Sequence, residues 1–362
     1  MKAVLAGGGS AGHVSPLLAL ADRLVADDPS SQIVALGTET GLEARLVPAR
    51  GYRLHPVPKV PLPRRPSADL LRLPANLRRA VREARGAIDE LGADVVVGFG
   101  GYVAAPAYLA ARQAKVPIVV HEQNSRPGFA NRLGARLTRS VAVTFPGTPL
   151  RHAVRTGLPL RSEIDTLNRG AIRPAARAAF GLEAGRTTLL VVGGSLGAQR
   201  LNMVLPALVP DLAAAGVQVL HVAGAGKSVA VTASDGAPPY RVVEYADHME
   251  LAYAAADLVV GRAGANTVSE LTALGLPAVY VPLPVGNGEQ RLNAAPVVAA
   301  GGGLMVEDAE LTPDWLRANL LPLLSDADRR RTMGTAARGF GRLDADRELA
   351  DLVRKTVAEA NR

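Results

Sequence analysis

Four glycine-rich clusters in this 362-residue chain each follow a short apolar run, where their backbone could bind an anion. Glycine permits tight turns and lets backbone N–H groups approach a phosphate at the start of a helix. One such cluster could equally be a plain strand-to-helix turn, but four of them favour ligand binding. The clusters are residues 7–13, 98–102, 193–197 and 261–265.

His13 follows the glycines of the first cluster, and imidazole is the side chain best suited to proton transfer near neutral pH. The alternative is a helix-start histidine that only hydrogen-bonds the loop or a phosphate. Residues 7–12 also match the G-x-G-x-x-G fingerprint of dinucleotide-binding proteins. That class needs an acidic residue where the second strand ends, but the run 33–36 is followed by Gly37 and Thr38. A nicotinamide-dependent dehydrogenase is therefore the weaker interpretation.

The elements that must position these clusters are short apolar runs that alternate with helical stretches, as in parallel α/β sheets. The alternation lapses into a polar, proline-containing segment at 161–174 and then restarts. We therefore expect two doubly wound, Rossmann-like α/β domains at 1–162 and 163–342, with ligands beyond the carboxyl ends of their strands. Residues 344–360 have apolar side chains at helical spacing, which predicts a last helix.

The composition of the chain limits the classes of partner that it is expected to bind. The formal net charge of +8 suggests acidic partners such as nucleotide phosphates or an anionic lipid surface. Nucleic acid is not expected, because aromatic residues are only 4% of the chain and no aromatic-interleaved basic strand occurs. The chain has no cysteine, so thiolate metal sites and cysteine nucleophiles are excluded. No apolar run approaches the roughly 20 residues that a membrane span needs, so any membrane contact is expected to be peripheral.

Five motifs, in this order, give the chain a resemblance to a known family. They are the first cluster, Gly-Gly-Tyr at 100–102, His-Glu-Gln-Asn at 121–124, Gly-Gly-Ser-Leu-Gly-Ala at 193–198, and Arg-Ala-Gly-Ala-Asn-Thr-Val-Ser-Glu at 262–270. The set resembles the GT-B glycosyltransferases, and among them the N-acetylglucosaminyltransferases of peptidoglycan synthesis. The resemblance covers essentially the whole chain and implies two domains that face each other across a cleft, with a C-terminal helix (343–362) packed back on the first.

The resemblance implies transfer of N-acetylglucosamine, with inversion, from UDP-N-acetylglucosamine to the 4-hydroxyl of undecaprenyl-pyrophosphoryl-N-acetylmuramyl pentapeptide. The protein would work peripherally at the cytoplasmic face of an anionic cell membrane, with the acceptor on the first domain and the donor on the second. No cofactor is required and no protein metal site is predicted, although a divalent cation could assist through the substrate phosphates. The alternatives are another UDP-sugar transferase of this fold, a UDP-N-acetylglucosamine epimerase, and a non-catalytic nucleotide-sugar-binding regulator.

Donor contacts are implied for the second domain. Ser195 would bind a phosphate oxygen, Arg262 would supply a cation, and Glu270 would accept the ribose hydroxyls. A structural salt bridge is the alternative for Arg262, and a surface carboxylate is the alternative for Glu270. Glu289 stands where the family often has a glutamine, which makes it a doubtful ligand. The remaining implied donor contacts are Ala246, Gly264, Ala265, Asn266, Thr267, Val268, Ser269 and Gln290.

The first domain carries His13, our candidate general base. The implied substrate contacts beside it are Ser10, Ala11, Gly12, Asn124, Asn131 and Arg161. Asn124 could instead be a turn residue before Pro127. The segment 59–85 mixes leucines with lysine and arginines, which suits a peripheral membrane surface. Its alternative is a core-facing amphipathic helix with a solvated basic side.

Overall fold

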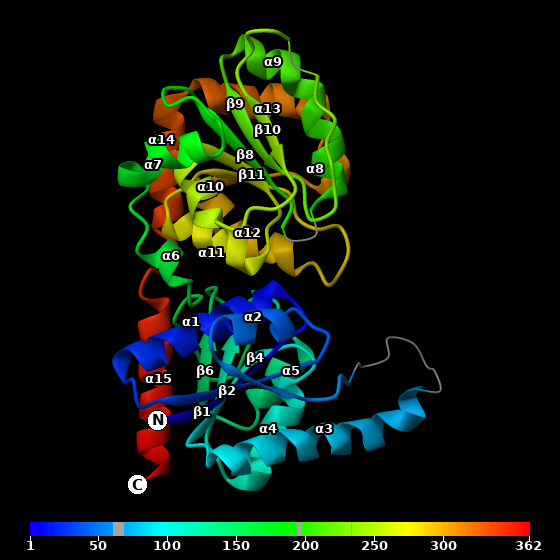
Figure 1. Ribbon diagram of the computed structural model, residues 1–362, viewed down its shortest axis with the longest axis vertical. Helices are drawn as coiled ribbons and strands as arrows, with labels where there is room; N and C mark the ends of the chain where they lie inside the picture. The colour runs from blue at the N-terminus through cyan, green and yellow to red at the C-terminus, as the bar shows by residue number, and fades with distance from the viewer. Residues whose placement is uncertain (61–68, 195–196, 233) are drawn as a thin grey trace. The chain divides into compact units, whose positions relative to one another are not determined.

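The computed structural model describes residues 1–60, 69–194, 197–232 and 234–362. These form two compact units, Met1–Arg161 with Leu343–Arg362, and Ser162–Arg342. Each unit has one parallel β-sheet with helices packed on it (Figure 1). The predicted α/β class with two doubly wound sheets is confirmed.

The first unit is built on a seven-stranded sheet in the order β3-β2-β1-β4-β5-β6-β7. Its strands are Lys2–Gly7 (β1), Gln32–Gly37 (β2), Arg53–Pro56 (β3), Val95–Gly100 (β4), Ile118–Glu122 (β5), Ser140–Val143 (β6) and Ala153–Arg155 (β7). Its helices are Ala11–Asp27 (α1), Glu43–Ala49 (α2), Asp69–Leu91 (α3), Ala104–Ala114 (α4), Phe129–Gly134 (α5) and Ala345–Ala360 (α15).

Both faces of this sheet are covered. Side chains alternate along a strand, so Val4 and Ala6 pack with α3 and α4 on one face, whereas Ala3 and Leu5 pack with α1 and α15 on the other. Burial on both faces explains why the strands appear in the sequence as continuous apolar runs.

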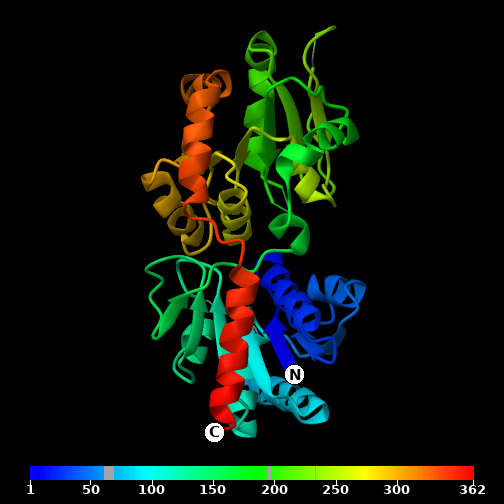
Figure 2. The ribbon, with the colours of Figure 1, turned by 90° about the vertical axis from the view of Figure 1, so that its left-hand side faces the viewer.

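Helix α15 completes the second of these faces although it is the last element of the chain (Figure 2). Leu349, Ala350 and Val353 are fully buried in the same core as α1. The Thr356 hydroxyl lies 2.8 Å from the Ser140 hydroxyl, and Arg354 pairs with Asp27. The core of the first unit therefore contains residues from both ends of the chain.

The second unit has a six-stranded sheet in the order β10-β9-β8-β11-β12-β13. Its strands are Thr188–Val192 (β8), Gln218–Val222 (β9), Tyr240–Val243 (β10), Leu258–Gly261 (β11), Ala278–Tyr280 (β12) and Gly303–Met305 (β13). Its α-helices are Ser162–Asp165 (α6), Arg169–Ala179 (α7), Gln199–Val204 (α8), Val209–Ala214 (α9), Met249–Ala255 (α10), Ala265–Ala273 (α11), Glu289–Ala299 (α12), Pro313–Ser325 (α13) and Ala327–Arg338 (α14). Two 3₁₀ turns are Leu205–Leu208 (η1) and Asp308–Glu310 (η2).

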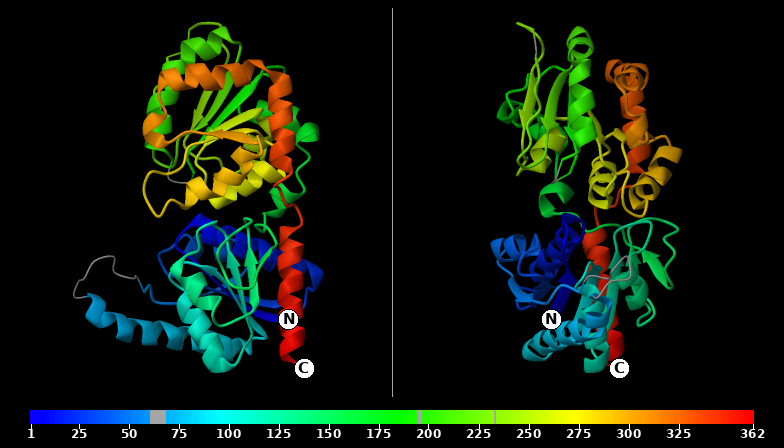
Figure 3. Two further views of the ribbon diagram at one scale, coloured as in Figure 1. Left: turned by 180° about the vertical axis from the view of Figure 1, so that it is seen from behind. Right: turned by 90° about the vertical axis from the view of Figure 1, so that its right-hand side faces the viewer.

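A buried apolar cluster joins β8, β9, β11 and β12 to α8, α9, α13 and α14, which places these helices on one face of the sheet. The helices surrounding each sheet can be followed from behind and from the side in Figure 3. In the described part of the chain, none of the helices is both long and apolar enough to cross a membrane.

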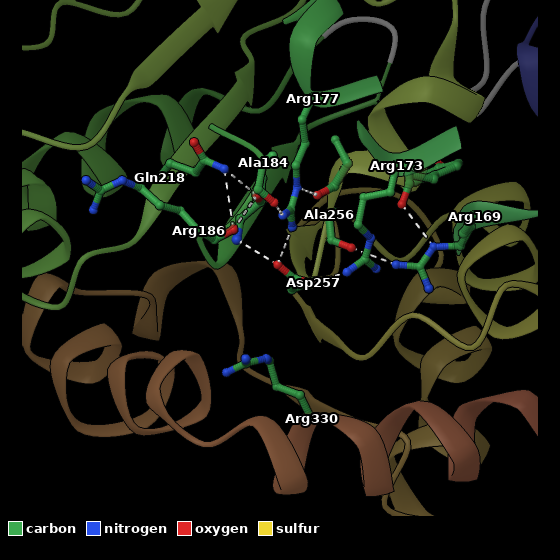
Figure 4. Close-up of polar contacts among 12 residues, drawn as sticks. Arg169, Arg173, Arg177, Ala184, Arg186, Gln218, Ala256, Asp257 and Arg330 are labelled. Carbon is green, nitrogen blue, oxygen red and sulfur yellow. Dashed lines mark hydrogen bonds and ion pairs between the residues drawn. The ribbon is translucent and has the colours of Figure 1, made fainter. Parts of the chain in front are cut away.

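An arginine cluster fixes α7 to the start of β11 (Figure 4). Arg169, Arg173 and Arg177 are spaced four residues apart and therefore share one face of α7. Arg173 and Arg177 each donate to the Asp257 carboxylate at 2.8 Å. Arg169 donates to main-chain carbonyls, including that of Ala256 at 2.6 Å. Burial lowers the pKa of Arg169 to about 10, so its guanidinium stays charged at neutral pH.

We expect the substitution Asp257→Asn to destabilise the protein by about 3 kcal/mol, because it removes the charge that compensates the buried Arg177 guanidinium. Urea unfolding followed by circular dichroism measures this change. Asp328→Asn is the matched control, since Asp328 pairs with Arg331 at the exposed surface. Equal unfolding midpoints for the two variants would contradict the assignment.

Candidate active-site loops in the two units

The carboxyl ends of β1, β2, β4 and β5 lie at one edge of the first sheet, and their loops crowd together there. A Cβ at Gly101 would lie only 2.4 Å from the carbonyl oxygen of Gly8, and Gly101 has a φ of +78°. Only glycine satisfies both conditions. The first and second glycine clusters are therefore in backbone contact.

The half-buried imidazole of His13 lies in the first turn of α1, against Gly100. A Cβ at Gly100 would approach the His13 ring to 3.1 Å. His13 Nδ1 lies 2.9 Å from the Ser10 hydroxyl. Burial lowers the pKa of His13 to about 4, although the Glu43 carboxylate and the Gly8 backbone oppose this shift. His13 is therefore neutral at pH 7 and able to accept a proton.

Glu43, at the start of α2, is fully buried beneath the first glycine cluster. Its Oε2 accepts from the Gly9 N–H at 3.0 Å, and its Oε1 accepts from the Thr38 N–H and hydroxyl at 2.8 and 2.7 Å. Burial raises the pKa of this carboxyl, but the hydrogen bonds from Gly9 and Thr38 outweigh burial and hold the pKa below its ordinary value. Glu43 was not predicted as a site residue, although a carboxylate that closely follows Gly37 and Gly41 was a visible signal.

The His-Glu-Gln-Asn run lies at the end of β5, and its first three side chains are buried. Glu122 is buried, and it accepts from the backbone N–H groups of Asn124 and Gly128 at 2.9 and 3.0 Å. Burial raises the pKa of Glu122, and these hydrogen bonds only partly oppose the shift. The Asn131 amide donates both its hydrogens, to the His121 carbonyl and to Glu122 at 3.0 Å each, while its oxygen accepts from Tyr108 at 2.8 Å.

Asn131 was predicted to contact substrate, but it is 1% exposed and both its N–H groups are committed. We therefore assign Asn131 to holding the 122–128 loop and not to binding a ligand. Asn124 lies half-buried in the loop that Glu122 holds, and Ser10, Ala11 and Gly12 form the exposed or half-buried start of α1. Arg161 is the last residue of the first unit before the chain enters the second.

In the second unit the loops after β8, β9, β11 and β12 share the corresponding edge of the sheet. Gly197 has a φ of +68°, and a Cβ there would lie 2.0 Å from the Ala223 carbonyl oxygen, so this loop also contains backbone in contact with backbone. Ser195 lies outside the described residues. Ala246, predicted to contact the uracil base through its backbone, is buried, whereas its neighbour Tyr245 is exposed.

Arg262 was predicted to offer its charge to a diphosphate, with a structural salt bridge as the alternative. The side chain forms the salt bridge: it is buried, pairs with Asp308, and donates to the carbonyls of Val281 and Pro282 at 3.1 Å each. These contacts tie the end of β12 to η2. These contacts are the structural salt bridge that the sequence left open as the alternative, and a contact of Arg262 with a diphosphate stays a prediction.

Gln290 connects two strand-end loops. Its Oε1 accepts from the backbone N–H groups of Ala263 at 3.1 Å and Leu283 at 3.0 Å. The amide nitrogen of Gln290 takes part in neither of these hydrogen bonds. Glu289 contacts its own loop instead, because its carboxylate accepts from the Asn287 N–H at 3.3 Å.

Helix α11 contains most of the residues predicted to bind the donor substrate. Gly264 is its N-cap residue in extended conformation, so Ala265, Asn266 and Thr267 form its first turn, where N–H groups point outward. Ser269 is half-buried. The Val268 side chain is fully buried, so Val268 can offer a ligand only its backbone. Glu270 is 8% exposed and accepts from the Tyr253 hydroxyl at 2.7 Å.

No group of three or more histidine, cysteine, aspartate or glutamate residues within the described ranges is arranged to hold a metal ion. The chemistry that the loops do offer is backbone N–H groups at helix starts, the neutral imidazole of His13 and buried carboxylates that brace the loops. Such loops beyond the carboxyl ends of two parallel sheets suit a nucleotide-linked substrate.

Comparison with known proteins identifies the class. Residues 3–143 match the glycosyltransferase family 28 N-terminal domain, and residues 188–351 match the glycosyltransferase family 28 C-terminal domain. The crystal structure of MurG from Acinetobacter baumannii is similar with a TM-score of 0.75 at 29% identity, covering 98% of this chain and 100% of that one. Fold and strand-end loops thus define a glycosyltransferase of the GT-B type, as predicted.

A curated relative narrows this class. The UDP-N-acetylglucosamine–N-acetylmuramyl-(pentapeptide) pyrophosphoryl-undecaprenol N-acetylglucosamine transferase of Streptomyces avermitilis is 56% identical over 363 residues, with both chains covered completely. This chain belongs to that transferase family. A UDP-GlcNAc 2-epimerase from Neisseria meningitidis has a TM-score of 0.69 at 12% identity and covers 98% of this chain and 100% of its own. It shares the fold alone.

We expect Glu270→Ala to weaken binding of UDP-N-acetylglucosamine by about 1–3 kcal/mol, because the charged hydrogen bonds predicted between this carboxylate and the ribose would be lost. Titration calorimetry measures this change. Tyr253→Phe is the control, since it removes the hydroxyl that contacts Glu270 but keeps the carboxylate. Undiminished affinity in the alanine variant would remove Glu270 from the donor site.

Proposed function

We propose that this protein transfers N-acetylglucosamine from UDP-N-acetylglucosamine to the 4-hydroxyl of a lipid-linked N-acetylmuramyl pentapeptide, with inversion at the anomeric carbon. The observation that carries the proposal is 56% identity, over the full length of both chains, to a transferase whose name states this donor and this acceptor. The neutral imidazole at the first glycine cluster supports it, because the reaction must remove a proton from an alcohol.

In this proposal the donor binds the loops of the second unit. The start of α11 stabilises the diphosphate, since its N–H groups and helix dipole favour negative charge. Glu270 accepts hydrogen bonds from the ribose, and Gln290 donates from its amide nitrogen to the sugar or phosphate. Ser195 and Arg161 remain predictions. The proposal includes no protein-bound cofactor, and a divalent cation on the substrate phosphates is compatible with it.

His13 is the proposed general base. If its Nδ1–H donates to the Ser10 hydroxyl, its Nε2 is left as the proton acceptor. The acceptor 4-hydroxyl attacks the anomeric carbon from the side opposite the departing UDP, and Nε2 takes the hydroxyl proton as the new bond forms. A pKa of about 4 makes His13 a weak base in the free protein.

The test is incubation with labelled UDP-N-acetylglucosamine and a short-chain analogue of the lipid-linked acceptor, with a disaccharide lipid as the expected product. His13→Ala should lower turnover by roughly 10²–10⁴-fold and leave donor affinity almost unchanged. The control is His152→Asn, at an exposed histidine of the same unit.

Other products would contradict the proposal in distinguishable ways. Epimerisation of the donor sugar without acceptor would indicate an epimerase, and donor binding without any reaction would indicate a regulator. Transfer to a different alcohol would keep the class and change the acceptor. Near-full turnover in the alanine variant would remove His13 as the base, and a parallel loss of donor affinity would make it a ligand.

We further propose that the protein works peripherally at the cytoplasmic face of an anionic membrane, through the basic side of α3. Arg78, Arg79 and Arg82 are exposed there, and the first turns of α3 extend away from the sheet (Figure 1). Leu73 and Leu77 pack partly buried against the core, which is the amphipathic arrangement considered as the alternative. The proposed attraction is therefore electrostatic. Residues 61–68, which complete the basic segment, lie outside the described ranges.

The double substitution Arg78→Glu and Arg79→Glu should weaken binding to vesicles that contain anionic phospholipid by about 10- to 30-fold. Raising the salt concentration should likewise weaken binding of the unaltered protein to these vesicles. Sedimentation with vesicles measures both effects. Arg329→Glu with Arg331→Glu is the control, because it changes the net charge equally at exposed positions of α14. Equal losses in both double variants would refute α3 as the membrane surface.

A further inference from the structure

The buried carboxylate of Glu43 is unusual in its surroundings. Cβ atoms at Gly8, Gly37 and Gly41 would lie 2.5, 2.4 and 2.3 Å from Glu43 side-chain atoms. Two backbone segments, the loop after β1 and the loop after β2, therefore close around the Glu43 side chain at distances that leave no space for a Cβ. Such a group costs stability to bury unless it is hydrogen-bonded, and here both its oxygens accept hydrogen bonds.

The position of this carboxylate has a chemical meaning. In dinucleotide-binding folds the first strand-end glycine loop directs its N–H groups at a pyrophosphate. Here the Gly9 N–H instead donates to Glu43 Oε2 at 3.0 Å. An anion supplied by the protein itself thus takes a hydrogen bond that a bound phosphate would otherwise take.

The contact continues directly to His13. Gly9 precedes Ser10, whose carbonyl accepts from the His13 N–H at 3.1 Å and whose hydroxyl lies 2.9 Å from His13 Nδ1. On the other side, Gly100 packs against the imidazole. The direction in which His13 points therefore depends on the position of Gly9 and Ser10, which Glu43 holds.

We propose that Glu43 is a positioning residue for His13: its carboxylate substitutes for a phosphate in the first glycine loop and fixes the loop and the start of α1. The inference rests on the proposed function, in which His13 is the general base. It predicts that the loop has no need of a phosphate to become ordered, and that loss of the carboxylate affects turnover more than donor binding.

Two variants separate positioning from general stability. In Glu43→Gln, the amide oxygen can still accept from Thr38, but the amide nitrogen then faces the Gly9 N–H, so two donors oppose each other. This change breaks the loop contact selectively. Thr38→Val is the matched control, since it removes one hydrogen bond to Glu43 and leaves the Gly9 contact in place.

The experiment measures turnover, donor KM and the Gly9 amide resonance of protein labelled with [¹⁵N]glycine. Glu43→Gln should lower kcat about 10²-fold with donor KM unchanged, as expected for a misplaced catalytic group. Its Gly9 proton resonance should move upfield on loss of the charged acceptor. Thr38→Val should keep both kcat and the resonance. Acetate should partly restore turnover in Glu43→Ala by filling the vacated space, and should not restore Glu43→Gln.

The proposal is overturned if Glu43→Gln retains full turnover, if its donor KM rises as its kcat falls, or if Thr38→Val loses as much activity. An unmoved Gly9 resonance in Glu43→Gln overturns it as well, whatever the activity. If the unaltered protein makes no disaccharide lipid, the proposed function fails. The resonance then still decides whether Glu43 holds the loop.

Discussion

In a parallel sheet, the loops that follow the strands all lie at the same edge. The close packing of these loops is the constraint on which the candidate sites of both units depend. The backbone of Gly101 meets that of Gly8, and the backbone of Gly197 meets that of Ala223, at separations that leave no space for a Cβ. Loops packed so closely have few conformations available. The glycines therefore do more than permit turns, because they allow the loops of the site to pack backbone against backbone.

Close main-chain packing leaves polar groups that need partners away from water. Buried carboxylates supply them in the first unit: Glu43 for the loop after β1, and Glu122 for the loop after β5. In the second unit the corresponding partners are the Gln290 amide and the Arg262 guanidinium. Polar residues placed among strand-end glycines thus brace the loops from within.

The sequence was sufficient to predict the sheets, because strands covered on both faces are continuous apolar runs and the alternation with helices is regular. It was also sufficient to place the glycine clusters at strand ends. It could not assign partners to polar side chains. The contact between Gly9 and Glu43 spans 34 residues, and that between Arg173 and Asp257 spans 84, so no local pattern reports them. The residue types of Arg262 and Asn131 suit both ligand binding and loop bracing, so only geometry could reveal their bracing contacts.

The packing of α15 on the first unit has a consequence for how the chain is made. A ribosome completes β1 to β7 and then the entire second unit before it synthesises Leu349, Ala350 and Val353, which close the core beside α1. During that interval the apolar cluster that contains Leu17, Leu20 and Leu24 lacks the three side chains of α15. The core of the first unit can therefore be completed only after the second unit has been synthesised, against the usual N-to-C order of domain folding during synthesis.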